Sequence, residues 1–281
     1  MHLLMMAIAL ILAWMVRLLS QPTGSHSPHA WGLSLFCFLF SPLLLLATAI
    51  AVLFMGASGA MLGLRASWFG YIVALCFVVF GVVLLLQLAY RAYKSQQQIN
   101  TYSPQVILGK EARILATSLP YSAQIGWWRS RLVISQGLLA TLDTPHLEAV
   151  LAHEQAHCHY RDTFWFFWLG WLRSFTSWLP NTELLWQELL LLRELRADRR
   201  AAGEIDSLVL AESLLAVAKA PLMQAESFCA PFSCAVPRDR LGERIDALLQ
   251  EGNESISTFS WWTCIGILLA FIPLVTIPLH Y

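Results

Sequence analysis

The sequence predicts a mainly α-helical, multi-pass membrane protein with one polar α+β region between its third and fourth membrane helices. Hydrophobic residues make up 57% of the chain and charged residues only 13%, whereas soluble domains carry about 25% charged residues. Four apolar segments approach the roughly 20 residues that cross a bilayer as a helix. The region from 91 to 259 holds all 18 acidic residues and 16 of the 18 basic ones, because only Arg17 and Arg65 precede it.

The apolar segments define the expected membrane layout. Residues 1–95 should form three transmembrane helices, at about 3–19, 31–55 and 70–90, and residues 260–281 a fourth helix and a tail. The first segment lacks the basic start and the A-x-A-like site of a cleaved signal peptide. Arg17 follows the first helix, and Arg91 and Lys94 follow the third, so the positive-inside rule places those helix ends in the cytoplasm. We therefore expect a plasma- or inner-membrane protein whose region 96–259 is a cytoplasmic domain.

For the first half of the polar region, the sequence predicts short strands followed by a helix. Strand patterns cover 105–107, 112–116, 121–126 and 131–135, and a short helix is expected at 138–142. A longer helix should start with Thr144 as its N-cap and Pro145 in its first turn, and should continue to about Tyr160.

The second half of the polar region reads as helical. The aromatic segment 163–179 is marginal as a fifth span, so we expect a helix that lies at the membrane surface or packs against the other spans. Further helices are expected at 182–202, which Gly203 would end, and at 211–220 and 238–250.

The sequence H-E-x-x-H lies within the helix that ends near Tyr160. His153 and His157 are four residues apart, so both imidazoles lie on one face of the helix and can bind one zinc ion. Glu154 between them can act as the general base on a metal-bound water. The six cysteines form no C-x-x-C pair, which argues against a cysteine zinc site. The formal net charge of zero gives no reason to expect direct nucleic-acid binding.

A catalytic zinc ion needs a third protein ligand. An elongated H-E-x-x-H-x-x-G-x-x-H motif is excluded, because Tyr160 and Thr163 occupy its last two defined positions. Glu194 is the best candidate, because Asp198 lies four residues later on the same helix face and can accept the second N–H of a histidine ligand. Glu188 is the main rival, but it lacks such an acidic partner.

Three stretches resemble a known family. Residues 150–162 read VLAHEQAHCHYRD and resemble the core of the BlaR/MecR-type membrane metallopeptidases, peptidase family M56. Residues 193–198, RELRAD, resemble that family's third-ligand helix, and 131–139, RLVISQGLL, the strand and turn before the active helix. Peptidase family M48, of HtpX and CAAX-protease type, shares the general pattern and is the nearest alternative.

The resemblance implies a gluzincin-type zinc metalloendopeptidase that holds one zinc ion and cleaves a protein or peptide at the cytoplasmic face of the bilayer. In the antibiotic-sensing members such a protease triggers the removal of a transcriptional repressor, so a repressor is one candidate substrate. The chain ends at Tyr281, shortly after the fourth helix, so we do not expect the penicillin-binding sensor of those members. In this fold type an extended substrate pairs with an edge strand, for which the candidates are Tyr121, Ser122, Ala123, Gln124, Ile125 and Gly126.

Two other functions remain open from the sequence. One is a quality-control protease of HtpX type that cleaves membrane proteins. The other is a non-catalytic membrane signalling scaffold. The complete set of His153, Glu154, His157 and Glu194 argues against the scaffold, because a decayed site should have lost at least one of these residues.

Overall fold

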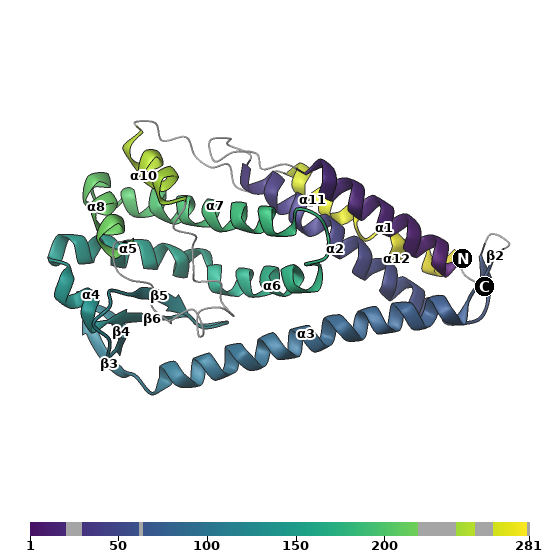
Figure 1. Ribbon diagram of the computed structural model, residues 1–281, viewed down its shortest axis with the longest axis horizontal. Helices are drawn as coiled ribbons and strands as arrows, with labels where there is room; N and C mark the ends of the chain where they lie inside the picture. Colours follow the sequence, from purple (N-terminus) through teal and green to yellow (C-terminus); the bar gives the residue numbers. More distant parts are fainter. Residues whose placement is uncertain (21–29, 62–63, 219–239, 251–260, 280–281) are drawn as a thin grey trace. The chain divides into compact units, whose positions relative to one another are not determined.

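The computed structural model describes residues 1–20, 30–61, 64–218, 240–250 and 261–279 (Figure 1). The chain divides into two compact units. We call residues 1–86, 171–189 and 254–281 the membrane unit, and residues 87–170 and 190–253 the site unit. Three of the unit boundaries fall within the helices α3, α6 and α7.

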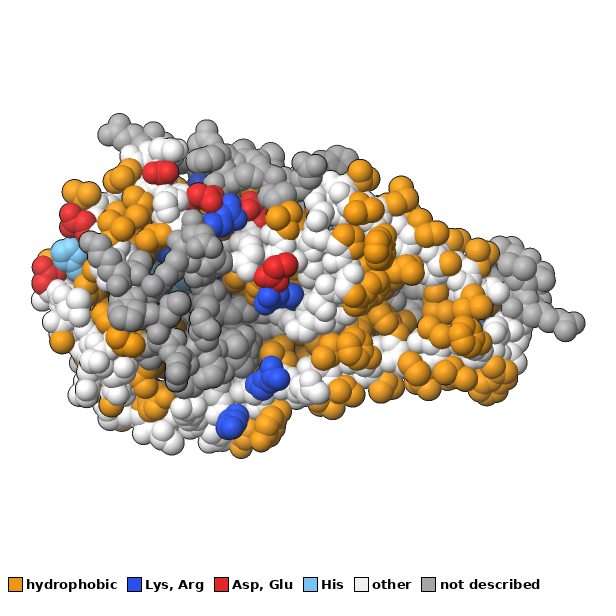
Figure 2. Space-filling view, viewed as in Figure 1, with side chains coloured by type: hydrophobic (Ala, Val, Ile, Leu, Met, Phe, Trp, Pro, Cys, Tyr) orange, Lys and Arg blue, Asp and Glu red, His pale blue; other side chains and the backbone are white. Residues whose placement is uncertain are grey.

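The membrane unit contains the helices α1 (His2–Leu19), α2 (Ala30–Met55) and most of α3 (Trp68–Asn100), with a short hairpin, β1 (Ala60–Met61) and β2 (Leu64–Arg65), between α2 and α3. All three helices are long and apolar enough to cross a membrane. Hydrophobic side chains cover much of the surface over α1 and α3 on the face drawn in Figure 2. Such a surface would be costly in water, which supports insertion of this unit into a bilayer.

The helices of the membrane unit pack through small and polar residues. Ala9 and Ala13 of α1 are buried against Leu44 and Leu45 of α2, and Ser41 Oγ donates a hydrogen bond of 3.0 Å to the carbonyl oxygen of Ala13. Small residues allow this close approach of two helices within lipid. Arg17 is fully buried near the end of α1 and donates from Nη2 to the carbonyl oxygen of Phe38 at 3.0 Å.

Within residues 261–279, which the structure describes, the C-terminal segment does not form the single helix that was predicted in the region 260–281. The helix α11 (Trp261–Leu269) ends at a turn, and α12 (Ile272–Val275) and the 3₁₀ helix η3 (Ile277–Leu279) follow. Pro273 and Pro278 explain the interruption, because proline lacks the backbone N–H that would continue the helical hydrogen-bonding pattern. Whether these short helices together cross the bilayer stays a prediction.

The aromatic segment predicted at 163–179 forms the helix α6 (Asp162–Phe175). It is 14 residues long, or about 21 Å, and is therefore too short to cross the hydrocarbon core alone. Its last turn packs on α3: the indole N–H of Trp171 donates to the carbonyl oxygen of Gly81 at 2.8 Å, and the rings of Phe175 and Phe77 lie 4.5 Å apart.

The site unit contains a four-stranded sheet at the predicted positions. Its strands are β3 (Ser103–Ile107), β4 (Lys110–Leu115), β5 (Ser122–Ile125) and β6 (Arg131–Ser135), in the order β3-β4-β6-β5. The β4–β6 pair is parallel, and the other two pairs are antiparallel. β5 is thus an edge strand, with Ser122 opposite Ile134 of β6, and its other edge pairs with none of the described strands.

The helices of the site unit follow the sheet in chain order. They are α4 (Gln136–Thr141), α5 (Thr144–Tyr160), the first part of α6, the second half of α7 (Thr182–Ala202), α8 (Ser207–Ala218) and α10 (Leu241–Leu249). The predicted N-cap of α5 was wrong by one residue. Asp143 is the cap, because its carboxylate accepts the backbone N–H of His146 at 3.2 Å, whereas Thr144 already lies within the first turn.

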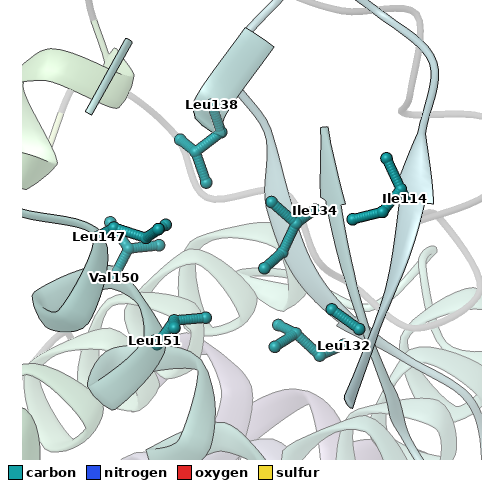
Figure 3. Close-up of a cluster of buried hydrophobic side chains, with 8 residues drawn as sticks. Ile114, Leu132, Ile134, Leu138, Leu147, Val150 and Leu151 are labelled. Atoms are coloured by element: carbon teal, nitrogen blue, oxygen red, sulfur yellow. The ribbon is translucent and has the colours of Figure 1, made fainter. Parts of the chain in front are cut away.

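The helix α5 is held between two buried clusters. Leu147, Val150 and Leu151 face the sheet and pack against side chains of β4, β6 and α4 (Figure 3). Ala149 and Ala152 pack against residues of α7, α8 and α10, where small side chains allow close approach. Residues three or four positions apart lie on one face of a helix, so these two sets form two buried faces of α5. This packing fixes the orientation of the side chains between them.

Candidate metal centre

Three potential ligands meet where α5 and α7 lie side by side. Nε2 of His153 lies 3.1 Å from Nε2 of His157. The carboxylate of Glu194 lies 3.3 Å from the first nitrogen through Oε2 and 3.5 Å from the second through Oε1. His153 and Glu194 are buried. The structure thus brings together the three residues that the sequence analysis selected as ligands.

The donor set fits a tetrahedral zinc ion. Zinc bonds of about 2.0–2.1 Å at tetrahedral angles put neighbouring ligand atoms roughly 3.3 Å apart. The three separations of 3.1, 3.3 and 3.5 Å scatter around that value. Two imidazoles and one carboxylate are also the ligands of known catalytic zinc sites, in which the fourth position stays open.

His153 is supported from its other ring nitrogen. Nδ1 lies 2.8 Å from Oδ1 of Asp198, although the two atoms are poorly aligned for a hydrogen bond. Asp198 in turn accepts two hydrogen bonds from Arg244 of α10, at 2.7 and 2.8 Å. Asp198 thus lies beside the ring of His153, and its expected support of a metal ligand stays a prediction. Arg244 was not anticipated, since no local sequence pattern connects α10 to α7.

His157 has a second, parallel support. Its Nδ1 lies 2.8 Å from Oδ2 of Asp162, and Oδ1 of Asp162 accepts a hydrogen bond from Arg196. The residue between helices α5 and α6, Arg161, adopts a left-handed conformation with φ of 54°, which turns the chain so that Asp162 reaches back to α5. Asp162 was missed by the sequence analysis. An acidic residue just past the end of the motif helix was the available signal.

The charges of the site shift the pKa values of both histidines. Burial alone would lower the pKa of His153, but the carboxylates of Asp198 and Glu194 outweigh it and raise that pKa to about 10. The pKa of His157 is raised in the same way, against burial, by Glu194 and Asp162. A divalent cation would displace these protons, because histidine binds metals in its neutral form.

The carboxylates are held in the charged form. Burial favours the neutral acid at Glu194, but Arg193, His157 and Arg244 lower its pKa well below the usual range. At Asp198 burial is likewise overcome, mainly by Arg244 and then by His153, so its pKa is lowered. Both groups are therefore ready to accept bonds from a cation or from an imidazole N–H.

Glu154 lies beside the potential ligands and contacts the edge strand. It is buried, and its Oε1 accepts a hydrogen bond of 2.8 Å from Oγ of Ser122 in β5. A cavity of about 210 Å³ is lined by these two residues, by Ala123 and Gln124, and by the three potential ligands. The predicted base and the central part of the predicted substrate strand thus share one cavity.

The rejected alternatives lie elsewhere. His159 is exposed, lies on another face of α5 than His157, and does not join the cluster. Glu188 also lies outside the cluster and belongs to the membrane unit.

The comparisons with known proteins include a match to a family model. A family model described as Peptidase family M48 matches residues 110–225, which run from β4 through the H-E-x-x-H helix and the helix that carries Glu194. M48 was the alternative to the M56 resemblance, and the M56 assignment gains no support. No match is found among curated proteins or among solved structures. The match and the His-His-Glu cluster support a metallopeptidase of membrane type.

Proposed function

We propose that this protein is a zinc-dependent endopeptidase of gluzincin type that cleaves a cytoplasmic or membrane-proximal protein. One observation carries the proposal: His153, His157 and Glu194 converge at the ligand spacing of a tetrahedral zinc ion, and Glu154 lines the same cavity. The M48 match over the same region supports peptidase chemistry.

The residues of the cavity suit peptide hydrolysis. A zinc ion, when bound, would polarise the scissile carbonyl and acidify a water molecule. Ser122 holds Oε1 of Glu154, which leaves Oε2 to take a proton from the attacking water and to return it to the leaving amine. His153 and His157 would hold the ion through Nε2, while Asp198 and Asp162 orient the rings through Nδ1.

The edge strand β5 is suited to bind a substrate in extended conformation. It pairs only with β6 among the described strands, so its outer edge offers backbone groups to a peptide in extended conformation. Addition of a strand would hold the peptide through main-chain bonds and would lay its scissile bond along the side of the cavity that Ser122 and Ala123 line.

Regulatory cleavage, with a transcriptional repressor as one candidate substrate, is our first proposal for the biological role. Quality control of membrane proteins fits the M48 match equally well. A cytoplasmic site unit is part of both proposals and rests on Arg91 and Lys94, which follow the apolar part of α3. Reporter fusions at the chain ends test this orientation, and a cytoplasmic C-terminus would overturn the four-span layout.

The direct test is elemental analysis of purified protein with two matched substitutions. We expect about one zinc ion per chain in the wild type and in Glu188→Gln, and a large loss in Glu194→Gln. A chelator should stop cleavage of an unstructured protein substrate, and added zinc should restore it. Full metal content in Glu194→Gln would remove Glu194 from the ligand set, and cleavage that survives chelation would overturn the proposal.

A further inference from the structure

An exposed aromatic surface lies next to the cavity strand. The loop 126–130 connects β5 to β6 and carries Trp127 and Trp128, whose exposed fractions are 45% and 67%. The start of α6 adds Trp165, which is 58% exposed. We call the loop 126–130 together with Phe164, Trp165 and Trp168 the aromatic loop surface.

The rings of this surface support one another. Trp127 stacks on Phe164 with a centroid separation of 6.3 Å, and it also contacts Phe167 and Trp168. Trp128 meets Phe164 edge to face at 5.3 Å. The loop is therefore packed from one side, while large parts of two indoles stay exposed. Exposure of several indoles to water is unfavourable, so this surface indicates a site that binds a partner.

The position of the loop along α3 points to a lipid bilayer as that partner. Gly126 lies directly against Gln96, since a Cβ atom added to Gly126 would come within 2.8 Å of Oε1 of Gln96. Arg131, at the start of β6, donates to Asn100, four residues farther along α3. Both ends of the loop thus lie beside the polar end of α3, near Gln96 and Asn100.

Helix geometry gives the distance from the hydrocarbon core. The apolar part of α3 ends at Tyr90, and Arg91 follows it. Gln96 is five residues beyond Arg91, or about 7.5 Å along the helix axis. The headgroup layer on one side of a bilayer is roughly 5–7 Å thick. With the edge of the hydrocarbon core placed at Arg91, the backbone of the loop would lie near the outer edge of that layer, within reach of long indole side chains.

The residue types of the aromatic loop surface also fit a lipid bilayer. Tryptophan is the residue type enriched at membrane–water interfaces, where the ring is buried and its N–H stays near water. Exposed Arg129 lies in the loop, and the guanidinium of exposed Arg161 lies 5.7 Å from the ring centroid of Trp128. These cations would attract anionic headgroups. The helix α6 also continues to Trp171 and Phe175, which pack on α3 in the membrane unit.

We propose that the aromatic loop surface inserts into the headgroup region of a bilayer that contains anionic lipids, and so holds the edge strand β5 beside the membrane surface. Its consequence for substrate choice rests on the proposed peptidase function: membrane-anchored polypeptides would be presented to β5 more readily than soluble ones.

The first experiment measures insertion without any need for activity. The full chain, with its six native cysteines replaced, is given a single cysteine by Trp128→Cys, is labelled with a polarity-sensitive fluorophore and is reconstituted into vesicles with phosphatidylglycerol. Controls are Val106→Cys and Leu208→Cys, at exposed positions on β3 and α8. We expect a blue-shifted label at 128 that brominated lipids quench, and water-like, unquenched labels at the controls.

Two results would overturn the insertion. A label at 128 that is as water-like as the controls would show that the loop does not reach lipid, and a blue-shifted label that brominated lipids do not quench would show that protein covers it.

The second experiment tests the consequence for the substrate. Trp127→Ala with Trp128→Ala should slow cleavage of a lipid-anchored peptide by about tenfold, because burial of an aromatic side chain shifts an equilibrium by that order. Cleavage of the same peptide in soluble form should be unchanged. Equal slowing of both peptides would contradict this consequence, whereas a chain without any proteolysis would refute the proposed function and leave the insertion result standing.

Discussion

The two histidines of the metal centre are supported by parallel but unequal arrangements. At His153, Asp198 is bound by two hydrogen bonds from Arg244, and the side chains of these two residues are only 2% and 9% exposed. At His157, Asp162 is bound by Arg196, whose side chain is 21% exposed. The first arrangement joins α5, α7 and α10, whereas the second joins α7 to the junction of α5 and α6.

The comparison shows two ways to fix a histidine ring. An aspartate at Nδ1 keeps the proton on that nitrogen and leaves Nε2 for the metal. The arginine behind the aspartate compensates its buried charge, and this compensation matters more where water is excluded. The arrangement at His153 should therefore contribute more to stability and to metal affinity. The following substitutions test this difference, from the largest expected effect to the smallest.

Arg244→Ala should have the largest effect. It leaves Asp198 and Glu194 buried without their shared cation, since Nη1 of Arg244 also lies 3.4 Å from Oε2 of Glu194. Breaking a buried ion pair costs about 3–5 kcal/mol of folding free energy. Denaturant unfolding of the metal-free protein measures this loss. Arg244→Lys should recover only part of it, because lysine cannot bind a carboxylate through two parallel bonds. A loss below about 1 kcal/mol would contradict the assignment.

Asp198→Asn should weaken zinc binding by about 100-fold, or roughly 2.7 kcal/mol, at the upper end of the range for outer-shell partners of metal ligands. The amide cannot provide the negative charge that supports the N–H of His153. Competition with a fluorescent zinc chelator gives the affinity. Asp246→Asn, at an exposed position of α10, is the matched control and should leave the affinity unchanged.

Asp162→Asn should weaken zinc binding by about tenfold, or roughly 1.4 kcal/mol, in the same titration. The effect is smaller because the arrangement of Arg196 and Asp162 at His157 is closer to solvent. Water can therefore replace part of the interaction that the carboxylate makes with the N–H of His157. A loss equal to that of Asp198→Asn would show that the two histidines are supported equally and would remove the asymmetry.

Arg196→Ala should have the smallest effect, a loss of about 1 kcal/mol or less in folding free energy. Asp162 keeps its contact with His157, and water can reach the position of the guanidinium. The same unfolding experiment as for Arg244→Ala measures it. A loss as large as that of Arg244→Ala would contradict the difference in burial on which the comparison depends.

The parts of the site that sequence predicted are those encoded within single helices. His153 and His157 share a face of α5, and Glu194 and Asp198 share a face of α7, because residues four apart in a helix always do. The strand at 121–126 was also expected at an edge, and β5 lies there. Asp162 and Arg244 were missed because their roles depend on a left-handed turn and on the packing of α10, which no short pattern encodes.

Two fold predictions failed for local reasons. The helix expected in the region 260–281 is interrupted near Pro273 and Pro278, although the composition of the segment is apolar throughout. The cap of α5 is Asp143 because its carboxylate reaches the N–H of His146, whereas Pro145 at the second helical position made Thr144 look like the cap. The M56 resemblance rested on motifs that M48 shares, and the family model that matches is that of M48.

The central claim is that Glu154 is the base of a zinc peptidase, and Glu154→Gln tests it most directly. Glutamine keeps the shape of the side chain and can still accept the hydrogen bond from Ser122, but it cannot take a proton from water. Zinc content and proteolysis are to be measured on the same preparation. We predict unchanged zinc content and a loss of cleavage of about 10²–10⁴-fold. Full cleavage at unchanged zinc content would contradict the account.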